Sequence, residues 1–380
     1  MTKLRFQLPR WLLHLLLGGL AFLPLAAAVA DMIDTEKAKV RSTTLIENLD
    51  HPWSLAFLPD GKMLITERSG DLLIFDKEAK NRQLVRGLPD IEAYGQGGLL
   101  DVRPHPDFAT NQWVYFSYAA EGENGVGTEV ARGKLQGAQL SNLEVLFKLG
   151  PKSNRGQHFG SRLIFDKKGY LYITLGDRGE KNRAQDTQDH AGSVIRLHDD
   201  GRIPADNPFV VNKQGKPEIF SYGHRNIQGA DLHPKTGELW SHEHGPQGGD
   251  ELNISRNGQN FGWPVITYGV NYVIGTKIGE GTHKAGMQQP LHYWVPSIAP
   301  SGMSFYTGDA FPQWKNNVFV GSLKFRLLVR LELEGEKVTH EERLFKGKFG
   351  RIRDVRTGPD GFLYLLTDAD NGKLIRLSPN

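Results

Sequence analysis

The chain has 380 residues, with 46 Lys and Arg against 43 Asp and Glu, and it has no cysteine. The lack of cysteine excludes disulfides, thiolate catalysis and Cys-ligated zinc or iron–sulfur centres. A charge balance this close to neutral, without a basic block, argues against nucleic acid as a partner.

The first 30 residues have the features of a signal peptide. Three basic residues precede an apolar run over residues 11–25, and Ala28-Val29-Ala30 is a small-residue cleavage signature. We therefore predict cleavage after Ala30, export to a bacterial periplasm and no stable membrane insertion afterwards. The alternative is an uncleaved anchor, which the short apolar run and the lack of a stop-transfer pattern disfavour.

Six copies of one hairpin unit follow, and no linker separates them. Each copy has an apolar strand, a turn rich in Pro, Asp or Gly, and a second strand, because these turn residues fix or permit the backbone angles of a reversal. The copies begin at Leu55, Leu100, Leu163, Ala230, Met303 and Val355. Their spacing of about 45–70 residues predicts an all-β fold, a six-bladed β-propeller.

Each copy is predicted to be the inner hairpin of a four-stranded antiparallel sheet, with outer strands such as residues 71–75 and 329–333. Residues 31–380 are then one domain. Three longer segments are predicted to be loops over one mouth of the propeller, where loops usually carry function: residues 120–156, 178–218 and 264–300. The alternatives are a β-sandwich or barrel with similar turns, or a propeller with seven blades.

Residues 156–177 form the first candidate for catalysis. The segment begins with His158 in a Gly-rich loop, runs through the third hairpin and ends at Asp177. Because a hairpin returns the chain to its starting edge, His158 and Asp177 are expected at the same end of one sheet. A base with an orienting carboxylate can take a proton from an alcohol. The alternative interpretation is a polar loop with a structural histidine.

Hydrogen-bond donors and cations stand at matching edges of other copies. They are Gln96 before the second copy, Arg225 and Asn226 before the fourth, Lys324 after the fifth, and Arg351 and Arg353 before the sixth. In a propeller these edges converge on the central channel, so Arg225, Lys324, Arg351 and Arg353 are predicted to surround one small anionic ligand. The alternative is a set of solvated surface charges.

The Gly245-Pro246 pair suggests a metal site. Proline has no N–H and fixes φ, so neighbouring carbonyl groups can be held toward a cation. Calcium accepts carbonyl and carboxylate oxygens, and Asp250 and Glu251 supply negative charge nearby. The alternative is a simple turn.

Taken together, the chain resembles the soluble aldose sugar dehydrogenases that use pyrroloquinoline quinone (PQQ). The resemblance covers nearly all of residues 31–380. It rests on these motifs, in family order: Gly95-Gln-Gly-Gly-Leu-Leu, Gln157-His-Phe-Gly-Ser-Arg-Leu, Leu175-Gly-Asp, Gly223-His-Arg-Asn, Glu243-His-Gly-Pro, Gly258-Gln-Asn-Phe-Gly-Trp-Pro, Gly321-Ser-Leu-Lys and Arg351-Ile-Arg-Asp.

The resemblance implies two kinds of binding residue. PQQ, a tricarboxylated quinone, would be held by Lys324, Arg351, Arg353, Arg225 and Asn226, with contributions from Gln96 and Tyr272. One Ca2+, held by the carbonyl groups of Gly245 and Pro246, would coordinate PQQ. A second, structural Ca2+ would use the Glu251 carboxylate and the Phe261 carbonyl.

The resemblance also implies the chemistry. His158 would be the general base that takes the anomeric hydroxyl proton of an aldose as hydride passes to PQQ. Asp177 would raise the basicity of His158 and fix its tautomer, and Arg225 would stabilise charge on the reduced quinone oxygen. The product would be a lactone, and an external electron acceptor would reoxidise the cofactor.

The sequence departs from the glucose-specific branch of that family in two places. Gln157 stands where that branch has an aspartate, and the aromatic residues near Trp294 are arranged differently, so we expect broad aldose tolerance. Two other functions stay open. A calcium-dependent propeller lactonase would need a cage of carboxylates and Asn in the channel. A non-catalytic carbohydrate-binding propeller would lack the His158–Asp177 pair or the cations.

Overall fold

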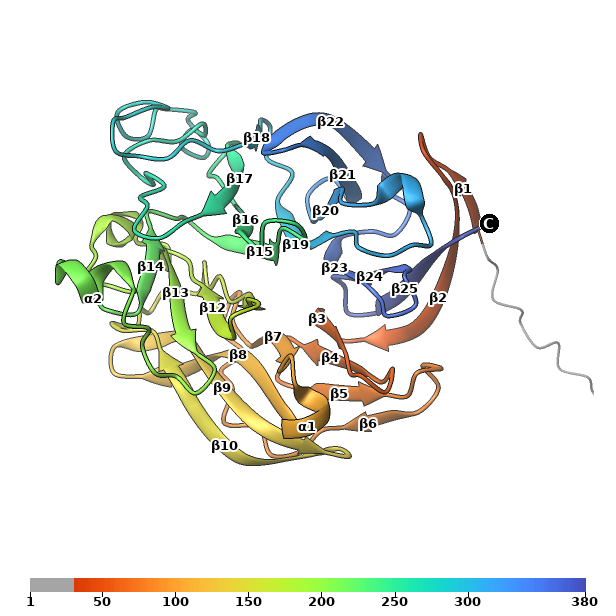
Figure 1. Ribbon diagram of the computed structural model, residues 1–380. Helices are drawn as coiled ribbons and strands as arrows, with labels where there is room; N and C mark the ends of the chain where they lie inside the picture. The colour runs from red at the N-terminus through yellow and green to blue at the C-terminus, as the bar shows by residue number, and fades with distance from the viewer. Residues whose placement is uncertain (1–30) are drawn as a thin grey trace, which may run out of the picture.

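The computed structural model describes residues 31–380, and the predicted signal peptide over residues 1–30 lies outside the described residues. The strands form six antiparallel sheets, arranged radially around a common axis (Figure 1). The predicted all-β, six-bladed propeller is therefore confirmed. Within residues 31–380, no helix has the length and apolar character needed to cross a membrane.

The blades are numbered along the chain, and each is given from its inner strand outward. Blade 1 contains β3 (Pro52–Phe57), β4 (Met63–Glu67), β5 (Leu72–Phe75) and β6 (Arg82–Leu84). Blade 2 contains β7 (Leu99–Pro104), β8 (Trp113–Gly122), β9 (Gly125–Gln136) and β10 (Gln139–Lys148). Blade 3 contains β11 (Leu163–Phe165), β12 (Tyr170–Thr174), β13 (Ser193–His198) and β14 (Ile219–Tyr222).

Blades 4 to 6 repeat this order. Blade 4 contains β15 (Ile227–Leu232), β16 (Leu239–Glu243), β17 (Asp250–Ser255) and β18 (His292–Trp294). Blade 5 contains β19 (Pro300–Phe305), β20 (Val318–Ser322), β21 (Leu327–Glu334) and β22 (Lys337–Leu344). Blade 6 contains β23 (Ile352–Thr357), β24 (Leu363–Thr367), β25 (Gly372–Pro379), β2 (Lys39–Leu49) and β1 (Asp31–Asp34). Short helices lie in the connections: α1 (Phe108–Asn111), α2 (Pro208–Asn212), and the 3₁₀ turns η1 (Lys181–Gln185) and η2 (Pro312–Trp314).

All six predicted hairpins are the first two strands of a blade. In blade 1, for example, Leu55 pairs with Ile65 across β3 and β4. The first strands of neighbouring blades contact one another around the channel, so the turn-rich repeats do mark the inner wall. The two predicted outer strands correspond to β5 and β21.

Two predictions about the periphery are wrong. Blade 6 has five strands rather than four, because the N-terminal β2 pairs with the C-terminal β25 and carries β1 with it. Residues 120–156 are mostly not a loop, because β9 and β10 form the outer half of blade 2. Residues 178–218 also contain β13, whereas residues 264–300 are largely loop, as predicted.

Three carboxylates tie neighbouring blades together in the channel wall. Asp101 of blade 2 accepts the backbone N–H of Leu163 in blade 3 at 2.8 Å. Asp231 of blade 4 accepts the backbone N–H of Phe305 in blade 5 at 2.8 Å. Asp354 of blade 6 accepts the backbone N–H of Leu55 in blade 1 at 3.1 Å. Apolar clusters fill the space between blades; one joins Leu64 and Ile74 of blade 1 to Phe116 and Leu135 of blade 2. The inner strands therefore form a rigid frame for the loops at their ends.

Candidate active site

A cavity of about 1000 Å³ lies at the end of the channel where the first strand of each blade begins. It brings together five of the predicted cofactor-binding residues, which are Gln96, Asn226, Lys324, Arg351 and Arg353. Its lining has five cationic side chains (Arg68, Lys324, Arg326, Arg351 and Arg353) and two carboxylates (Asp368 and Asp370). The apolar part of the wall includes Trp53, Leu100 and Phe159. An excess of cations beside flat apolar side chains suits a planar ligand with several negative charges.

Only part of this positive charge is paired within the protein. Arg351 and Arg353 both donate to the Asp368 carboxylate, at 2.7 and 3.0 Å. The Nε atom of Arg353 is buried and has no hydrogen-bond partner in the described chain. The ion pairs found within residues 31–380 include none for Lys324. Unused donors that line one cavity are the feature expected of a site for an anionic ligand.

His158 and Asp177 meet beside this cavity, as the hairpin predicts. Nδ1 of His158 lies 2.6 Å from Oδ1 of Asp177. The other carboxylate oxygen accepts the indole N–H of Trp263 at 2.8 Å. The backbone N–H of His158 donates to Oε1 of Gln96 at 2.9 Å, which joins the loop to blade 2. The carboxylate is therefore fixed on two sides, and it fixes the imidazole in turn.

The protonation states suit a general base. Burial lowers the pKa of His158 below its usual value, and the neighbouring Arg225 cation acts in the same direction. Burial alone would raise the pKa of Asp177, but the hydrogen bond from His158 holds it below its usual value. An ionised carboxylate can only accept, so Nδ1 carries the proton and Nε2 keeps its lone pair. The pair can thus take up a proton at Nε2 near neutral pH.

Arg225 lies next to this pair. The backbone N–H of Asp177 donates to the Arg225 carbonyl oxygen at 2.8 Å, so the two residues are held in register. The guanidinium group packs 5.3 Å from the Trp263 ring centroid and donates to the His244 carbonyl oxygen at 3.1 Å. The structure therefore places a cation close to the proposed base.

Three of the predicted metal-binding residues line one small cavity, and Pro246 is not among its lining residues. Gly245, Glu251 and Phe261 line it, together with Arg225 and Glu243. Burial and the neighbouring Glu243 carboxylate raise the pKa of Glu251 well above its usual range. No ion pair within residues 31–380 involves Glu251, so a bound cation would relieve this unfavourable burial.

The backbone around Gly245 is tightly packed. A Cβ atom at Gly245 would lie 2.2 Å from the carbonyl oxygen of Gly249, so only glycine fits there. Among residues 31–380, no three or more His, Asp or Glu side chains gather as a metal cage. A cation at this place would need backbone carbonyl oxygens as ligands, which differs from the side-chain cage that a propeller lactonase needs.

Tyr272 does not join the other predicted cofactor-binding residues. It lies at the tip of a hairpin-like loop, near the bridge between Val270 and Lys277, and 60% of its surface is exposed. It is not among the residues that line the central cavity. Cofactor binding by Tyr272 therefore stays a prediction, because this structure places the residue outside the cavity lining.

Four residues in or beside the site had no role in the sequence interpretation. Gln228, His244 and Asp368 line the central cavity, and Trp263 holds Asp177. His244 and Trp263 stand within motifs that resemble those of the family, and these motifs could have pointed to both residues as part of the site. Gln228 lies two residues before the predicted fourth copy and Asp368 at the end of the sixth, and no local pattern there separates a cavity-lining side chain from a structural one.

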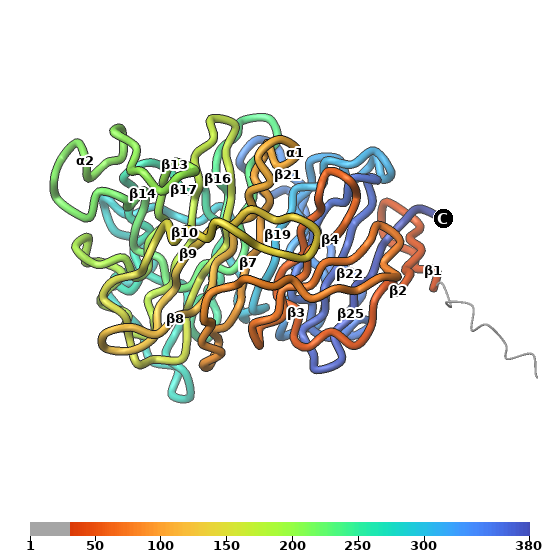
Figure 2. Tube along the Cα trace, turned by 90° about the horizontal axis from the view of Figure 1, so that it is seen from below, coloured from red at the N-terminus to blue at the C-terminus, as the bar shows by residue number. Residues whose placement is uncertain are grey.

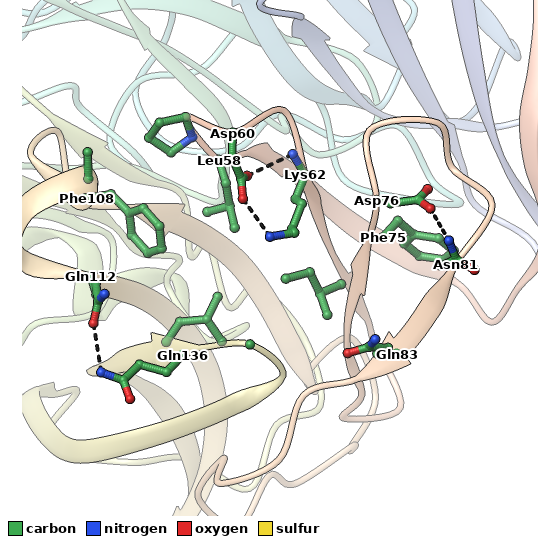
Figure 3. Close-up of a pocket in the computed structure, with 15 residues that line it drawn as sticks. Leu58, Asp60, Lys62, Phe75, Asp76, Asn81, Gln83, Phe108, Gln112 and Gln136 are labelled. Carbon is green, nitrogen blue, oxygen red and sulfur yellow. Dashed lines mark hydrogen bonds and ion pairs between the residues drawn. The ribbon is translucent and has the colours of Figure 1, made fainter.

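A second cavity, of about 630 Å³, lies between blades 1 and 2 (Figure 3). It is lined by residues from the turns at the opposite ends of the inner strands, so it does not join the central cavity. Its polar side chains bond one another: Lys62 pairs with Asp60, Asn81 with Asp76, and Gln136 with Gln112. With these groups already satisfied, this cavity is a poor candidate for a polar ligand.

The comparisons with known proteins agree with the site. The family described as glucose/sorbosone dehydrogenase matches residues 49–376. Aldose sugar dehydrogenase YliI of Escherichia coli (strain K12) is 46% identical over 348 residues, which cover 90% of this chain and 94% of that protein.

Two solved structures are similar over nearly their whole length. The apo form of the soluble aldose sugar dehydrogenase from Escherichia coli has a TM-score of 0.87 at 46% identity, covering 90% of this chain and 100% of that one. The PQQ-bound aldose sugar dehydrogenase from Streptomyces coelicolor has a TM-score of 0.74 at 26% identity, covering 93% and 100%.

The fold and these matches together define an enzyme, an oxidoreductase built on a six-bladed propeller. The chain belongs to the glucose/sorbosone dehydrogenase family.

Proposed function

We propose that the protein oxidises aldose sugars at the anomeric carbon to lactones, with PQQ and Ca2+ as cofactors. The observation that carries the proposal is the cation-lined cavity with the His158–Asp177 pair at its edge. The names of the Escherichia coli relative and of the PQQ-bound Streptomyces protein support the substrate class and the cofactor.

The cavity fits a flat tricarboxylate. Lys324, Arg351 and Arg353 would pair with its carboxylates, and the buried Nε of Arg353 supplies a donor that the protein itself leaves unused. Gln96 and Asn226 would add neutral hydrogen bonds from blades 2 and 4. Trp53 and Phe159 would add apolar contacts to PQQ, because their aromatic surfaces suit a planar ring system.

Two calcium positions are proposed from the donor sets. The carbonyl oxygens of Gly245 and Pro246 would hold one ion near Arg225. The Glu251 carboxylate and the Phe261 carbonyl would hold the other, where burial now leaves a carboxylate without a cation.

When bound, PQQ supplies the two-electron acceptor and calcium supplies a Lewis acid. His158 then takes the anomeric hydroxyl proton at Nε2 while the C1 hydride leaves the sugar. Asp177 keeps the proton on Nδ1 and stabilises the imidazolium that forms, and the Arg225 cation stabilises negative charge that develops beside it. The hydroxyl proton and the C1 hydride leave the sugar together, so the product is the lactone.

The remaining parts of the proposal concern the surroundings of the enzyme. Export through the signal peptide at residues 1–30 would place the protein in the periplasm. The electrons would pass to an external acceptor, which is a quinone, a dye or a small redox protein. Gln157 at the site edge leaves the specificity for one particular aldose open.

A reconstitution assay tests this function. The purified apo-protein should reduce an artificial dye after addition of PQQ and Ca2+, when it is given members of a panel of aldoses. The controls omit PQQ, Ca2+ or sugar in turn. No dye reduction with any sugar would contradict the proposal, and calcium-dependent lactone hydrolysis without PQQ would support the lactonase instead.

Lys324→Ala should chiefly weaken PQQ binding. A hydrogen bond to a charged group contributes about 1.5–3 kcal/mol, so we expect a loss of affinity of roughly 10-fold or more. A titration of the apo-protein with PQQ, followed by fluorescence, measures this loss. Lys337→Ala on the outer strand β22 is the control and should bind PQQ like the wild type. Undiminished affinity in the Lys324 variant would remove this residue from the cofactor site.

Removal of calcium should destabilise the PQQ-free protein, and Glu251→Gln should reduce that effect. Without a cation, the Glu251 carboxyl group stays beside the Glu243 carboxylate, which disfavours its ionised form, whereas Gln is neutral. Differential scanning fluorimetry with and without a chelator should show a fall in Tm for the wild type and a smaller fall for the variant. Equal shifts in the two proteins would argue against a calcium ion at Glu251.

A further inference from the structure

Arg178 is a buried arginine directly after Asp177, and nothing in the proposed reaction uses it. Its surface is 0% exposed. Its guanidinium group donates to the carbonyl oxygens of Gln157, of Arg155 at 2.6 Å and of Val126 at 3.3 Å. Two of these carbonyl groups belong to the loop that leads into His158.

The same guanidinium group also packs on an aromatic ring. Its Cζ atom lies 3.5 Å from the ring centroid of Phe159, the residue after His158. Arg178 therefore contacts the chain on both sides of His158, through carbonyl groups before it and a ring after it.

The environment of Arg178 differs from that of Arg162 and Arg330, which are also less than 2% exposed. Arg330 is equally buried, but it pairs with the Glu342 carboxylate at 2.6 Å. Arg162 lies 3.2 Å from the carboxylate of Asp354. The ion pairs within residues 31–380 include none for Arg178. A buried cation is costly unless it is compensated, and here carbonyl dipoles and a ring face supply the compensation.

The loop that Arg178 holds needs external support. Its backbone at His158 has φ of 57°, a left-handed conformation that is uncommon for a residue other than glycine. Residues 155–160 belong to no strand. Their other anchors include the bonds from His158 to Gln96 and to Asp177, the bond from the Gln96 N–H to the Gly156 carbonyl oxygen, and the bond from the Gly160 N–H to Asn226.

We propose that Arg178 is a positioning residue that clamps the His158 loop from behind and keeps the imidazole at the edge of the cavity. Asp177 and Arg178 then act as a pair of neighbours, the first holding the ring of His158 and the second holding its backbone. The inference rests on the proposed role of His158 as the base, and it is tested by a measurement that does not require sugar oxidation.

The test compares three variants of the mature chain with the wild type. Arg178→Met removes both the charge and the planar guanidinium group with its several N–H donors. Arg178→Lys keeps the charge but not the guanidinium group. Arg330→Met is the matched control, because Arg330 is just as buried but lies in β21 of blade 5 and pairs with carboxylates. Hydrogen exchange over residues 153–160 and tryptic cleavage after the exposed Arg155 report on the loop in the apo-protein. The kcat and KM of the reconstituted enzyme report on catalysis.

In Arg178→Met we expect faster hydrogen exchange over residues 153–160 and faster tryptic cleavage after Arg155. We also expect a kcat lower by about 10-fold or more with KM little changed, because small displacements of a catalytic group lower the rate strongly. Arg178→Lys should fall between this variant and the wild type. Arg330→Met should lose thermal stability without either effect. Unchanged exchange in both Arg178 variants would overturn the proposal, as would a loosened loop with an unchanged kcat, or an equal loss of kcat in Arg330→Met. If no protein, including the wild type, oxidises a sugar, the proposed function fails, and the exchange measurement alone decides whether Arg178 clamps the loop.

Discussion

His158→Ala is expected to lower the kcat of aldose oxidation by at least ~100-fold, the usual contribution of a general base, while PQQ still binds. The structure explains why neither Asp177 nor His244 would replace it. Asp177 is buried and engaged by His158, Trp263 and the backbone N–H of Gly179. Burial lowers the pKa of His244, which lines the central cavity, to about 3, so it is a weak base.

Steady-state kinetics on the reconstituted variant, together with a PQQ titration, would measure this effect. His190→Ala is a suitable control. His190 is also buried and hydrogen-bonded to a carboxylate, that of Glu218 at 2.7 Å, but it lies outside the cavity lining. A kcat for His158→Ala equal to that of the control would place the base elsewhere.

Asp177→Asn is expected to lower kcat by roughly 10- to 100-fold, because it disturbs both the orientation and the tautomer of His158. One carboxylate oxygen becomes an NH2 group. If that group faces His158 it donates to Nδ1, and the ring proton then moves to Nε2, where the lone pair is needed. Trp263 and Gly179 both donate to this side chain, so neither orientation of the amide satisfies every partner.

The pH dependence of kcat/KM in Asp177→Asn is expected to shift in a definite direction. A base works when it is deprotonated, so activity is present above the pKa of His158 and is lost as pH falls through it. Burial already lowers this pKa below 6.5, and the Asp177 carboxylate opposes that shift. Removal of the carboxylate charge should therefore move the acid limb of kcat/KM to still lower pH. Asp186→Asn, at an exposed position, is the control. An acid limb that moves to higher pH would contradict the role given to Asp177.

The sequence allowed the inner half of each blade to be predicted, because a hairpin and its turn are local features. The outer half was harder. Strand β9 carries Glu129, Arg132 and Lys134 among its apolar residues, which resembles an exposed loop. In the fold, however, Lys152 pairs with Glu129 at 2.6 Å and Glu144 with Arg132 at 2.8 Å. Partners so far along the chain leave no local pattern.

The same limit applies to the site. Gln96, Lys324 and Arg353 were predictable because they stand at strand ends that the propeller must bring together. Tyr272 was placed with them by resemblance, but the length and course of its loop decide where it lies. The sequence around Arg178 gives no local signal of burial, and only its burial and contacts in the fold suggest the proposed role at the His158 loop.

The pairing of β2 with β25 places both ends of the described chain at the outer rim of one blade, with Val40 opposite Pro379 (Figures 1 and 2). The central cavity is lined by residues around the beginnings of the inner strands, and neither end of the described chain is among them. A tether attached after Asn380 would therefore hold the molecule by its edge, on a resin or an electrode, and leave the entrance for sugar unobstructed. It would also pull along the seam that closes the ring, so a linker of several flexible residues is advisable between the tether and β25.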